Sequence, residues 1–222
     1  MGLSQLVFQP STSQRIVILG GGGTAVDFSE AALAAGNEVL GFLKDSAEQE
    51  PLPILGTLAE WKRLPEDVKF FCGFGSATSY KTRLDVLARL GIPEQRYAVI
   101  VHPQAAVSPS ATLGPGCGML SFVSLGARVR LGAHVEILQS VLIAHDCCLE
   151  DGVIIAGGAN LAAAVHVGRG AYIGAGACIR GKTLVGERAL LGMNSTLLEN
   201  LPAGAMYAGS PAKQIRTRSA TS

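Results

Sequence analysis

A six-residue period of apolar side chains runs through the second half of the chain, from Val101 to Leu197. All seventeen repeat positions are aliphatic or methionine: Val101, Val107, Leu113, Met119, Leu125, Leu131, Ile137, Ile143, Leu149, Ile155, Leu161, Val167, Ile173, Ile179, Val185, Leu191 and Leu197. Four residues after each comes a mostly small or β-branched position, beginning with Ala105 and ending with Leu201. A helix of about 3.6 residues per turn would lose phase with this period within two turns, whereas hexapeptide periods are typical of parallel β-helices. The pattern therefore predicts a β-solenoid.

The residues before the repeat follow an α/β pattern instead. The apolar run 15–19 predicts a buried strand, the apolar positions of 25–35 have helical spacing, and 38–43 predicts a second strand. Together they make one βαβ unit. A further strand at 68–72 and a helix at 84–90 lead into the repeat without a linker. This length makes only half of a dinucleotide-binding fold, so a nucleotide-sugar is a better-sized ligand than a nicotinamide dinucleotide.

A glycine-rich turn joins the first strand to the first helix. Gly20, Gly22 and Ala25 fit the phosphate-loop pattern G-x-G-x-x-G/A, in the strand–turn–helix context that this pattern requires. Bare backbone amides at a helix N-terminus suit a pyrophosphate. Asp45 follows Gly20 by 25 residues, close to the place of a ribose-binding acid. A tight turn without a ligand is the competing interpretation.

These patterns divide the chain into three parts. We expect a Rossmann-like nucleotide-sugar-binding domain over 1–98, a β-helix over 99–203 and a C-terminal closing segment over 204–222. The last boundary follows from Pro202 and Gly204, which break the hexapeptide period.

Composition excludes several classes of function. Lys plus Arg total 18 against 17 for Asp plus Glu, so no field of one sign attracts nucleic acid or an anionic membrane. No apolar run reaches the roughly 18 residues of a membrane span, and the first residues lack the pattern of a signal peptide. The five cysteines have no CxxC spacing, which favours reduced thiols. We therefore expect a cytoplasmic protein without nucleic-acid or membrane partners.

His145 is the histidine of the four that an acid, Asp146, follows directly. Because Ile143 belongs to the inward class of the repeat, His145 is expected at an outward or corner position. A neutral imidazole near pH 7 can accept a proton from an attacking amine, and a neighbouring carboxylate fixes its tautomer and raises its basicity. The pair is a candidate general base with its helper; a polar pair in a solvated turn is the alternative.

The glycine-rich start, His102-Pro103, the hexads, His145-Asp146 and the segment 209–213 together resemble sugar N-acyltransferases of the hexapeptide-repeat, left-handed β-helix superfamily. More narrowly, the chain is similar to the enzymes of the sialic-acid O-acetyltransferase-like family that acetylate the amine of a nucleotide-linked 4-amino-4,6-dideoxy sugar for surface glycan biosynthesis. The resemblance implies left-handed coils of three hexads, a homotrimer, and acetyl-CoA in the groove between neighbouring β-helices. It makes the β-helix the acyltransferase domain, with His145 as base, Asp146 as its helper and direct attack of the amine on the thioester.

The resemblance also places the two substrates on particular residues. Six positions match the nucleotide-sugar pocket: Gly22, Gly23, Thr24, Lys44, Asp45 and Gly75. Four match the acetyl-CoA groove, largely through the backbone: Ile154, Ala175, Met193 and, as a weaker candidate for the donor to the oxyanion, Ala163. The chain departs from the family where members commonly carry His, an acid, Asn and a hydrogen-bonding residue: at Thr24, Lys44, Leu138 and Ile154. These departures leave the nucleotide, the sugar and the acyl group open.

Other functions fit the same scaffold. An O-acetyltransferase acting on a sugar or a sialic-acid-type substrate would need the same base. A metal lyase of the γ-carbonic-anhydrase type would need three histidines, including a closely spaced pair, but His134, which is expected at an exposed coil position, and His166 stand 11 and 21 residues from His145. The histidine spacing leads us to expect no metal, while the resemblance implies acetyl-CoA as co-substrate. A non-catalytic nucleotide sensor is the remaining alternative.

Overall fold

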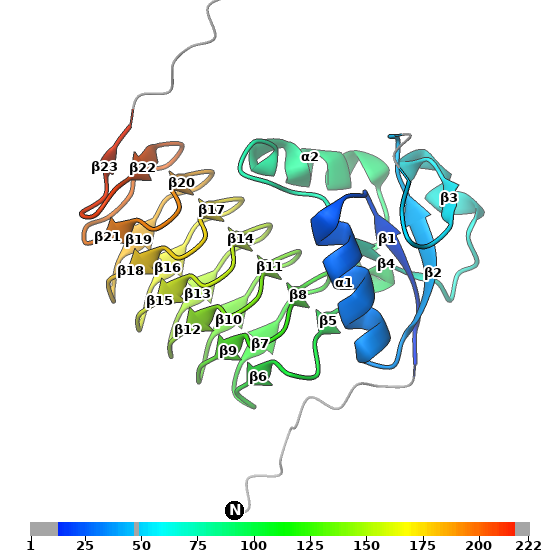
Figure 1. The fold of residues 1–222 in the computed structure, drawn as a ribbon, viewed down its shortest axis with the longest axis horizontal. Helices are drawn as coiled ribbons and strands as arrows, with labels where there is room; N and C mark the ends of the chain where they lie inside the picture. Colours follow the sequence, from blue (N-terminus) through cyan, green and yellow to red (C-terminus); the bar gives the residue numbers. More distant parts are fainter. Residues whose placement is uncertain (1–12, 47–48, 216–222) are drawn as a thin grey trace, which may run out of the picture.

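The computed structural model describes residues 13–46 and 49–215. An N-terminal α/β part is followed by a long β-helix, and the two lie side by side (Figure 1). The expectation about a signal peptide concerns residues outside the described ranges. Within those ranges, no helix is long and apolar enough to cross a membrane.

The N-terminal part is a four-stranded parallel sheet in the order β3-β2-β1-β4. Its elements in chain order are β1 (Arg15–Leu19), α1 (Gly23–Ala34), β2 (Glu38–Leu43), β3 (Ile54–Gly56), the 3-10 helix η1 (Leu58–Arg63), β4 (Lys69–Cys72), α2 (Tyr80–Leu90) and the 3-10 helix η2 (Glu94–Arg96). The predicted βαβ unit is β1-α1-β2. Helix α2 begins at Tyr80, before the predicted start at residue 84, because Tyr80 and Arg83 in its first turn are also buried.

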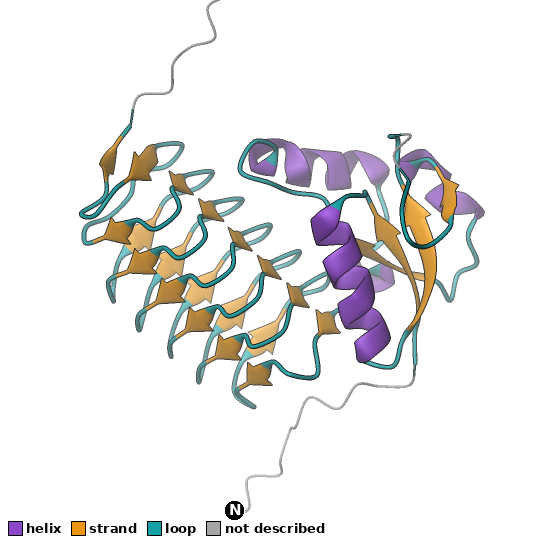
Figure 2. Cartoon of the chain, viewed as in Figure 1, coloured by secondary structure: helices purple, strands orange, loops and turns teal. Residues whose placement is uncertain are grey.

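The β-helix is a three-sided prism built from short parallel strands (Figure 2). The first face contains β5 (Ile100–Val101), β8 (Gly118–Met119), β11 (Glu136–Ile137), β14 (Ile154–Ile155), β17 (Tyr172–Ile173), β20 (Leu190–Leu191), β22 (Met206–Ala208) and the antiparallel β23 (Lys213–Gln214). The second face contains β6 (Ala106–Val107), β9 (Ser124–Leu125), β12 (Leu142–Ile143), β15 (Asn160–Leu161), β18 (Cys178–Ile179) and β21 (Thr196–Leu197). The third face contains β7 (Thr112–Leu113), β10 (Arg130–Leu131), β13 (Cys148–Leu149), β16 (His166–Val167) and β19 (Leu184–Val185).

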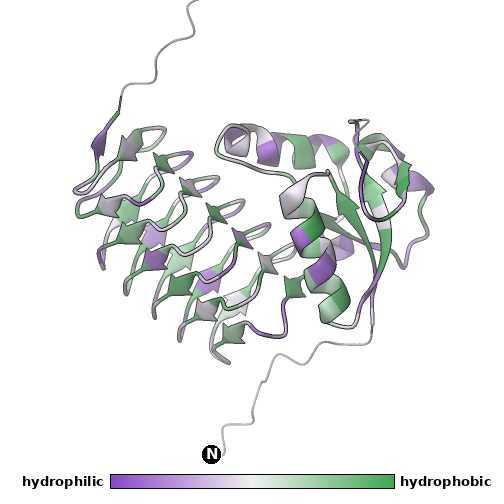
Figure 3. Ribbon diagram, viewed as in Figure 1, coloured by the Kyte–Doolittle hydropathy of each residue, from purple (hydrophilic) through white to green (hydrophobic). Residues whose placement is uncertain are grey.

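Each coil is three hexads long, so a residue pairs with the one 18 positions further on. Glu136 opposite Ile154, and Cys148 opposite His166, are examples of this register. The second residue of each two-residue parallel strand points inward, and these residues form the hydrophobic core of the β-helix, whose hydropathy is drawn in Figure 3. Ile137, a typical member of the core, has no exposed surface. The hexapeptide period thus predicted the inward positions correctly.

The corners of the prism repeat one backbone feature. From Leu113 to Leu191, the third residue after each inward aliphatic position has a positive φ, for example 58° at Arg128, 63° at Asp146 and 62° at Lys182. Glycine takes the same position in other coils, as at Gly158. Each corner therefore turns the chain within four residues and presents two of them outward.

The N-terminal part covers the first face of the prism. A Cβ on Gly118 would lie 2.4 Å from the Phe71 ring, so β4 and the β-helix approach too closely for any side chain there. Ile154 packs with Tyr80 of α2 on the same face. The outward residues of the second and third faces, by contrast, are exposed or half-buried. Two faces of the prism therefore remain bare.

Candidate active site

His145 lies on the corner between β12 and β13, where the two bare faces meet. Its side chain is 58% exposed, while Ile143 at the end of β12 is buried in the core. This corner is the one opposite the covered first face. The predicted outward position of His145 is therefore the observed one.

The Asp146 carboxylate bridges His145 to an arginine of the preceding coil. Its Oδ2 lies 2.6 Å from His145 Nδ1. Arg128 donates to both carboxylate oxygens, from Nε to Oδ1 at 2.7 Å and from Nη2 to Oδ2 at 2.9 Å. The Arg128 hydrogen bonds, followed by the one from His145, hold the pKa of Asp146 well below its usual range. Asp146 is thus an ionised carboxylate near pH 7.

Sequence reasoning did not find Arg128. Its spacing from Asp146 is 18 residues, one full coil, and both occupy the positive-φ position of the same corner. The coil length was implied by the hexads, so reading the corner positions at intervals of 18 could have found the pair.

The glycine loop contains an internal acid. Glu50 Oε1 accepts a hydrogen bond of 3.0 Å from the backbone N–H of Gly22 and forms an ion pair with Lys44. Both side chains are almost fully buried, and the hydrogen bond from Lys44 lowers the pKa of Glu50. A Cβ on Gly21 would lie 2.3 Å from the Glu50 carboxylate, so only glycine fits there. The Glu50 carboxylate therefore already accepts a hydrogen bond from one backbone amide of the loop that was predicted to bind phosphate.

The other predicted nucleotide-sugar residues surround this loop in different ways. Gly23 opens α1, is exposed, and has room for a Cβ; Thr24, next to it, is half-buried. Asp45 is exposed and accepts a hydrogen bond from Leu58 N–H at the start of η1. Gly75 packs closely against the first face: a Cβ there would lie 2.7 Å from Ile154 Cδ1. The glycine loop and Lys44 lie together because both contact the Glu50 carboxylate. Asp45 instead contacts the backbone at the start of η1.

The four predicted acetyl-CoA residues lie in three separate places. Ile154 is 2% exposed, in the interface with α2. Ala163 lies one coil beyond His145 on the same corner, and Ala164 N–H donates to His145 O at 3.0 Å. Ala175 and Met193 lie on the corner between the first and second faces, where Met193 is exposed. Within this chain, only Ala163 neighbours His145.

A buried ion pair joins the two parts of the chain. Arg83 of α2 donates to Glu136 Oε1 at 2.6 Å, to His134 O at 2.6 Å and to Phe74 O at 2.9 Å. Glu136 is fully buried, and its second oxygen has no hydrogen-bond partner among residues 13–46 and 49–215. Burial raises the pKa of Glu136 to about 7, although Arg83 opposes this shift. The pair ties the Phe74–Gly75 loop to the β-helix.

His134 corrects one expectation. An exposed coil position was predicted, but its ring packs edge-on against Tyr97 with centroids 4.3 Å apart. Burial, together with nearby Arg83, lowers the pKa of His134 to about 4. The prediction was wrong because this corner lies beneath the N-terminal part.

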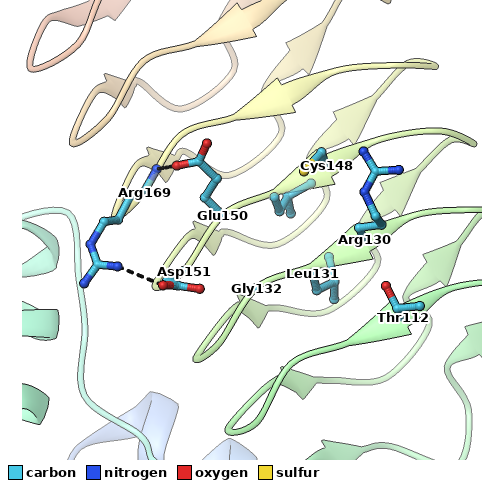
Figure 4. Close-up of a pocket in the computed structure, with 9 residues that line it drawn as sticks. Thr112, Arg130, Leu131, Gly132, Cys148, Glu150, Asp151 and Arg169 are labelled. Carbon is cyan, nitrogen blue, oxygen red and sulfur yellow. Dashed lines mark hydrogen bonds and ion pairs between the residues drawn. The ribbon is translucent and has the colours of Figure 1, made fainter.

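A shallow pocket on the third face contains further charged residues but not His145 (Figure 4). Arg169 Nη1 donates to Asp151 at 2.8 Å and its backbone N–H donates to Glu150 at 3.0 Å. His166 is paired with Glu150 at 2.7 Å. Among residues 13–46 and 49–215, no group of three His, Cys, Asp or Glu side chains is placed to hold a metal ion.

Comparison with known proteins shows which solved structures this chain resembles. The acetyltransferase domain of PglB from Neisseria gonorrhoeae is 30% identical over 91% of this chain and 100% of that one, with a TM-score of 0.82. The same domain is also known in complex with acetyl coenzyme A. PerB from Caulobacter crescentus, in complex with CoA and GDP-perosamine, has a TM-score of 0.82 at 24% identity, over 93% of this chain and 99% of that one. No protein-family model and no curated protein matches the sequence.

The fold and these neighbours define an acyltransferase with a left-handed β-helix. The chain belongs to the hexapeptide-repeat sugar N-acetyltransferases.

Proposed function

We propose that this protein transfers the acetyl group of acetyl-CoA to the amine of a nucleotide-linked 4-amino-4,6-dideoxy sugar. The observation that carries the proposal is the exposed His145–Asp146 pair, 2.6 Å apart, on the scaffold of a sugar N-acetyltransferase. The acetyl-CoA complex of the PglB domain supports the donor, and the GDP-perosamine complex of PerB supports the class of acceptor. Both substrates are cytoplasmic metabolites, so the reaction belongs in the cytoplasm, in the supply of sugars for surface glycans.

His145 serves as the general base of this reaction. Its imidazole accepts a proton from the sugar ammonium or from the amine as it attacks. The amine nitrogen bonds to the thioester carbonyl carbon, and the resulting tetrahedral intermediate expels CoA as a thiolate that takes up a proton. Backbone N–H groups near Ala163 are candidates to stabilise the oxyanion, since such donors contribute most when they are already oriented. No covalent acyl-enzyme is needed.

The positions of the two half-sites favour a shared active site. The N-terminal part covers the first face, whereas His145 is on the opposite corner of the same coil stack. The glycine loop belongs to the part that packs on the first face, and so lies across the prism from His145 of its own chain. A homotrimer in which one subunit's N-terminal part supplies the sugar to the next subunit's His145 corner joins the two half-sites.

The direct test is acetyl transfer with defined substrates. Purified protein is incubated with acetyl-CoA and UDP-, GDP- or dTDP-linked 4-amino-4,6-dideoxy sugars, and CoA release is followed together with the mass of the sugar product. We expect a gain of one acetyl group on an amino sugar, and little release with the matching 4-hydroxy sugar. Acetylation of the hydroxy sugar alone would replace the proposal with O-acetyl transfer.

Replacement of the base tests the chemistry. His145→Ala should fold as the wild type does and lose about 100-fold or more in kcat, because a positioned general base contributes roughly 10²–10⁴-fold. Asp146→Asn should cost less, since the imidazole remains. A near-wild-type rate of CoA release by His145→Ala, with an unchanged melting temperature, would exclude His145 as the base.

A further inference from the structure

Arg128 reaches the reaction centre only through Asp146. Its two donors engage both carboxylate oxygens, and Oδ2 is shared with His145 Nδ1. The three side chains form a line along one corner, from one coil to the next, and all are partly exposed. Backbone contact adds to the arrangement, because Arg128 N–H donates to Ser110 Oγ at 3.0 Å in the coil before.

The shared carboxylate decides which imidazole nitrogen carries the proton. An ionised carboxylate is only an acceptor, so the 2.6 Å contact requires a hydrogen on His145 Nδ1. In the neutral ring, Nε2 then carries the lone pair and can accept a proton from a substrate. A free imidazole in water prefers the opposite tautomer, with hydrogen on Nε2, which cannot act as a base through that nitrogen. The orientation of the Asp146 carboxylate therefore matters for catalysis.

Nothing in the local backbone fixes that orientation. Asp146 is on a tight corner with φ of 63°, its side chain is 39% exposed, and its sequence neighbour His145 is even more exposed. An exposed aspartate is free to turn toward water unless a second partner holds it. The planar guanidinium of Arg128 supplies two parallel hydrogen bonds, which fix both the position and the plane of a carboxylate.

We propose that Arg128 is a positioning residue, which holds Asp146 so that His145 keeps its hydrogen on Nδ1 and presents Nε2 as the base. The inference rests on the proposed function, because it gives His145 the role of base. The competing role for Arg128 is to join two coils by an exposed ion pair. Arg169 offers a matched control, since it joins Asp151 of the preceding coil at 2.8 Å on a different corner, without contact to His145.

The tautomer can be measured without substrate. Full-length protein labelled with ¹⁵N-histidine is examined by long-range ¹H–¹⁵N correlation at about pH 8, where a typical imidazole is neutral, and the His145 signals are assigned from His145→Gln. We expect the Nδ1–H form in the wild type and in Arg169→Ala. Arg128→Ala should convert His145 mainly to the Nε2–H form, and Arg128→Lys, which keeps the charge but not the paired donors, should give a mixture. The same tautomer in Arg128→Ala as in the wild type would overturn the proposal.

Kinetics provide the second readout. Arg128→Ala should lower kcat by about 10- to 100-fold, as for other misoriented catalytic groups, with KM for either substrate changed less than about twofold. Because both residues act through one hydrogen bond, Arg128→Ala combined with Asp146→Asn should be no slower than Asp146→Asn alone. If the kcat of the double variant were lowered by the product of the two single losses, the proposal would be contradicted. Failure of the proposed reaction would appear instead as absent transfer in the wild type, with the tautomer result unaffected.

Discussion

Arg83 and Glu136 form an ion pair without access to water at the junction of the N-terminal part and the β-helix. Arg83 donates to three acceptors, but one Glu136 oxygen has no partner within the part of the chain that the structure describes. A buried pair of this kind often adds little stability relative to apolar residues, whereas removal of one partner costs roughly 3–5 kcal/mol. Its place beside Phe74 and Gly75 indicates that the pair fixes where the predicted sugar-binding loop lies.

The raised pKa of Glu136 predicts an unusual dependence of stability on pH. Because the folded carboxyl has a pKa of about 7 against an ordinary 4.5, the folded state binds more protons than the unfolded state between these values. The free energy of unfolding contributed by this group therefore falls as pH rises from about 4.5 to about 7, by an amount on the order of 1–3 kcal/mol. Urea unfolding at several pH values should reveal this decline in the wild type and not in Glu136→Gln.

Glu136→Gln cannot ionise and stands in for the protonated carboxyl, so it should be at least as stable as the wild type at neutral pH, with the difference disappearing toward pH 4.5. The exposed substitution Glu30→Gln on α1 is a control that should keep the wild-type pH dependence. Parallel pH profiles for the wild type and Glu136→Gln would show that folding does not raise the pKa of Glu136, and would contradict the prediction.

Individual residues could be predicted from the sequence when their partners were close in the chain. His145 and Asp146 are adjacent, so their pairing needed only an outward corner. Prediction of the contact between Arg128 and Asp146 also required the length of one coil, 18 residues. Glu50 follows Gly22 by 28 residues, and no spacing rule brings them together, because their contact depends on how the chain after β2 returns to the loop.

At the scale of elements, the turn between β1 and α1 has the amides of a phosphate loop but already contains a carboxylate. A nucleoside diphosphate placed on Gly22 N–H would meet Glu50 at the same donor. Like charges at one site oppose binding, so ligand must displace Glu50 and take over its interaction with Lys44. The glycine pattern could be predicted from the sequence, but the presence of this internal acid could not.

Glu50→Gln should therefore bind a nucleoside diphosphate more tightly than the wild type does. Loss of the competing charge is expected to lower Kd by about 3- to 10-fold, equivalent to roughly 1 kcal/mol. Isothermal titration calorimetry with GDP, UDP and dTDP measures the change, and Glu30→Gln, at an exposed position of α1, controls for net charge. Weaker binding by Glu50→Gln would mean that Glu50 contacts the ligand rather than competing with it.

At the scale of the whole molecule, a shared active site makes a prediction about mixtures of inactive chains. His145→Ala keeps its glycine loop, while Gly23→Asp keeps its base but places a negative charge where a diphosphate is expected. A Cβ at Gly23 meets open space, so the second variant should fold. In randomly mixed trimers about one site in four combines an intact base with an intact loop from the neighbouring subunit.

Mixing the two variants under conditions that allow subunit exchange should therefore restore about a quarter of wild-type activity. Sedimentation analysis should show a trimer for each protein. Gly23→Ala, which adds no charge, should retain activity alone. No recovery on mixing, with trimers intact and exchange demonstrated, would place both half-sites within one chain.

The β-helix was the part of the fold that sequence determined most completely, because every inward position repeats at a fixed interval. The docking of the N-terminal part was not predictable in this way. It depends on complementary surfaces, such as Gly118 beneath Phe71 and Ile154 beneath Tyr80, whose residues have no common period. For the same reason, the burial of His134 and Ile154 beneath the N-terminal part could not be predicted from the hexapeptide pattern alone.

The 18-residue register also limits how the gene can change in length. Insertion of one residue between Arg128 and Asp146 would shift every later corner, moving the arginine out of line with the carboxylate and turning inward residues outward. A whole added coil beyond residue 146 would leave both the core and this corner in place, and would lengthen only the prism. Lineages that alter the length of this β-helix should therefore do so in steps of a full coil, at a distance from the corner that carries His145.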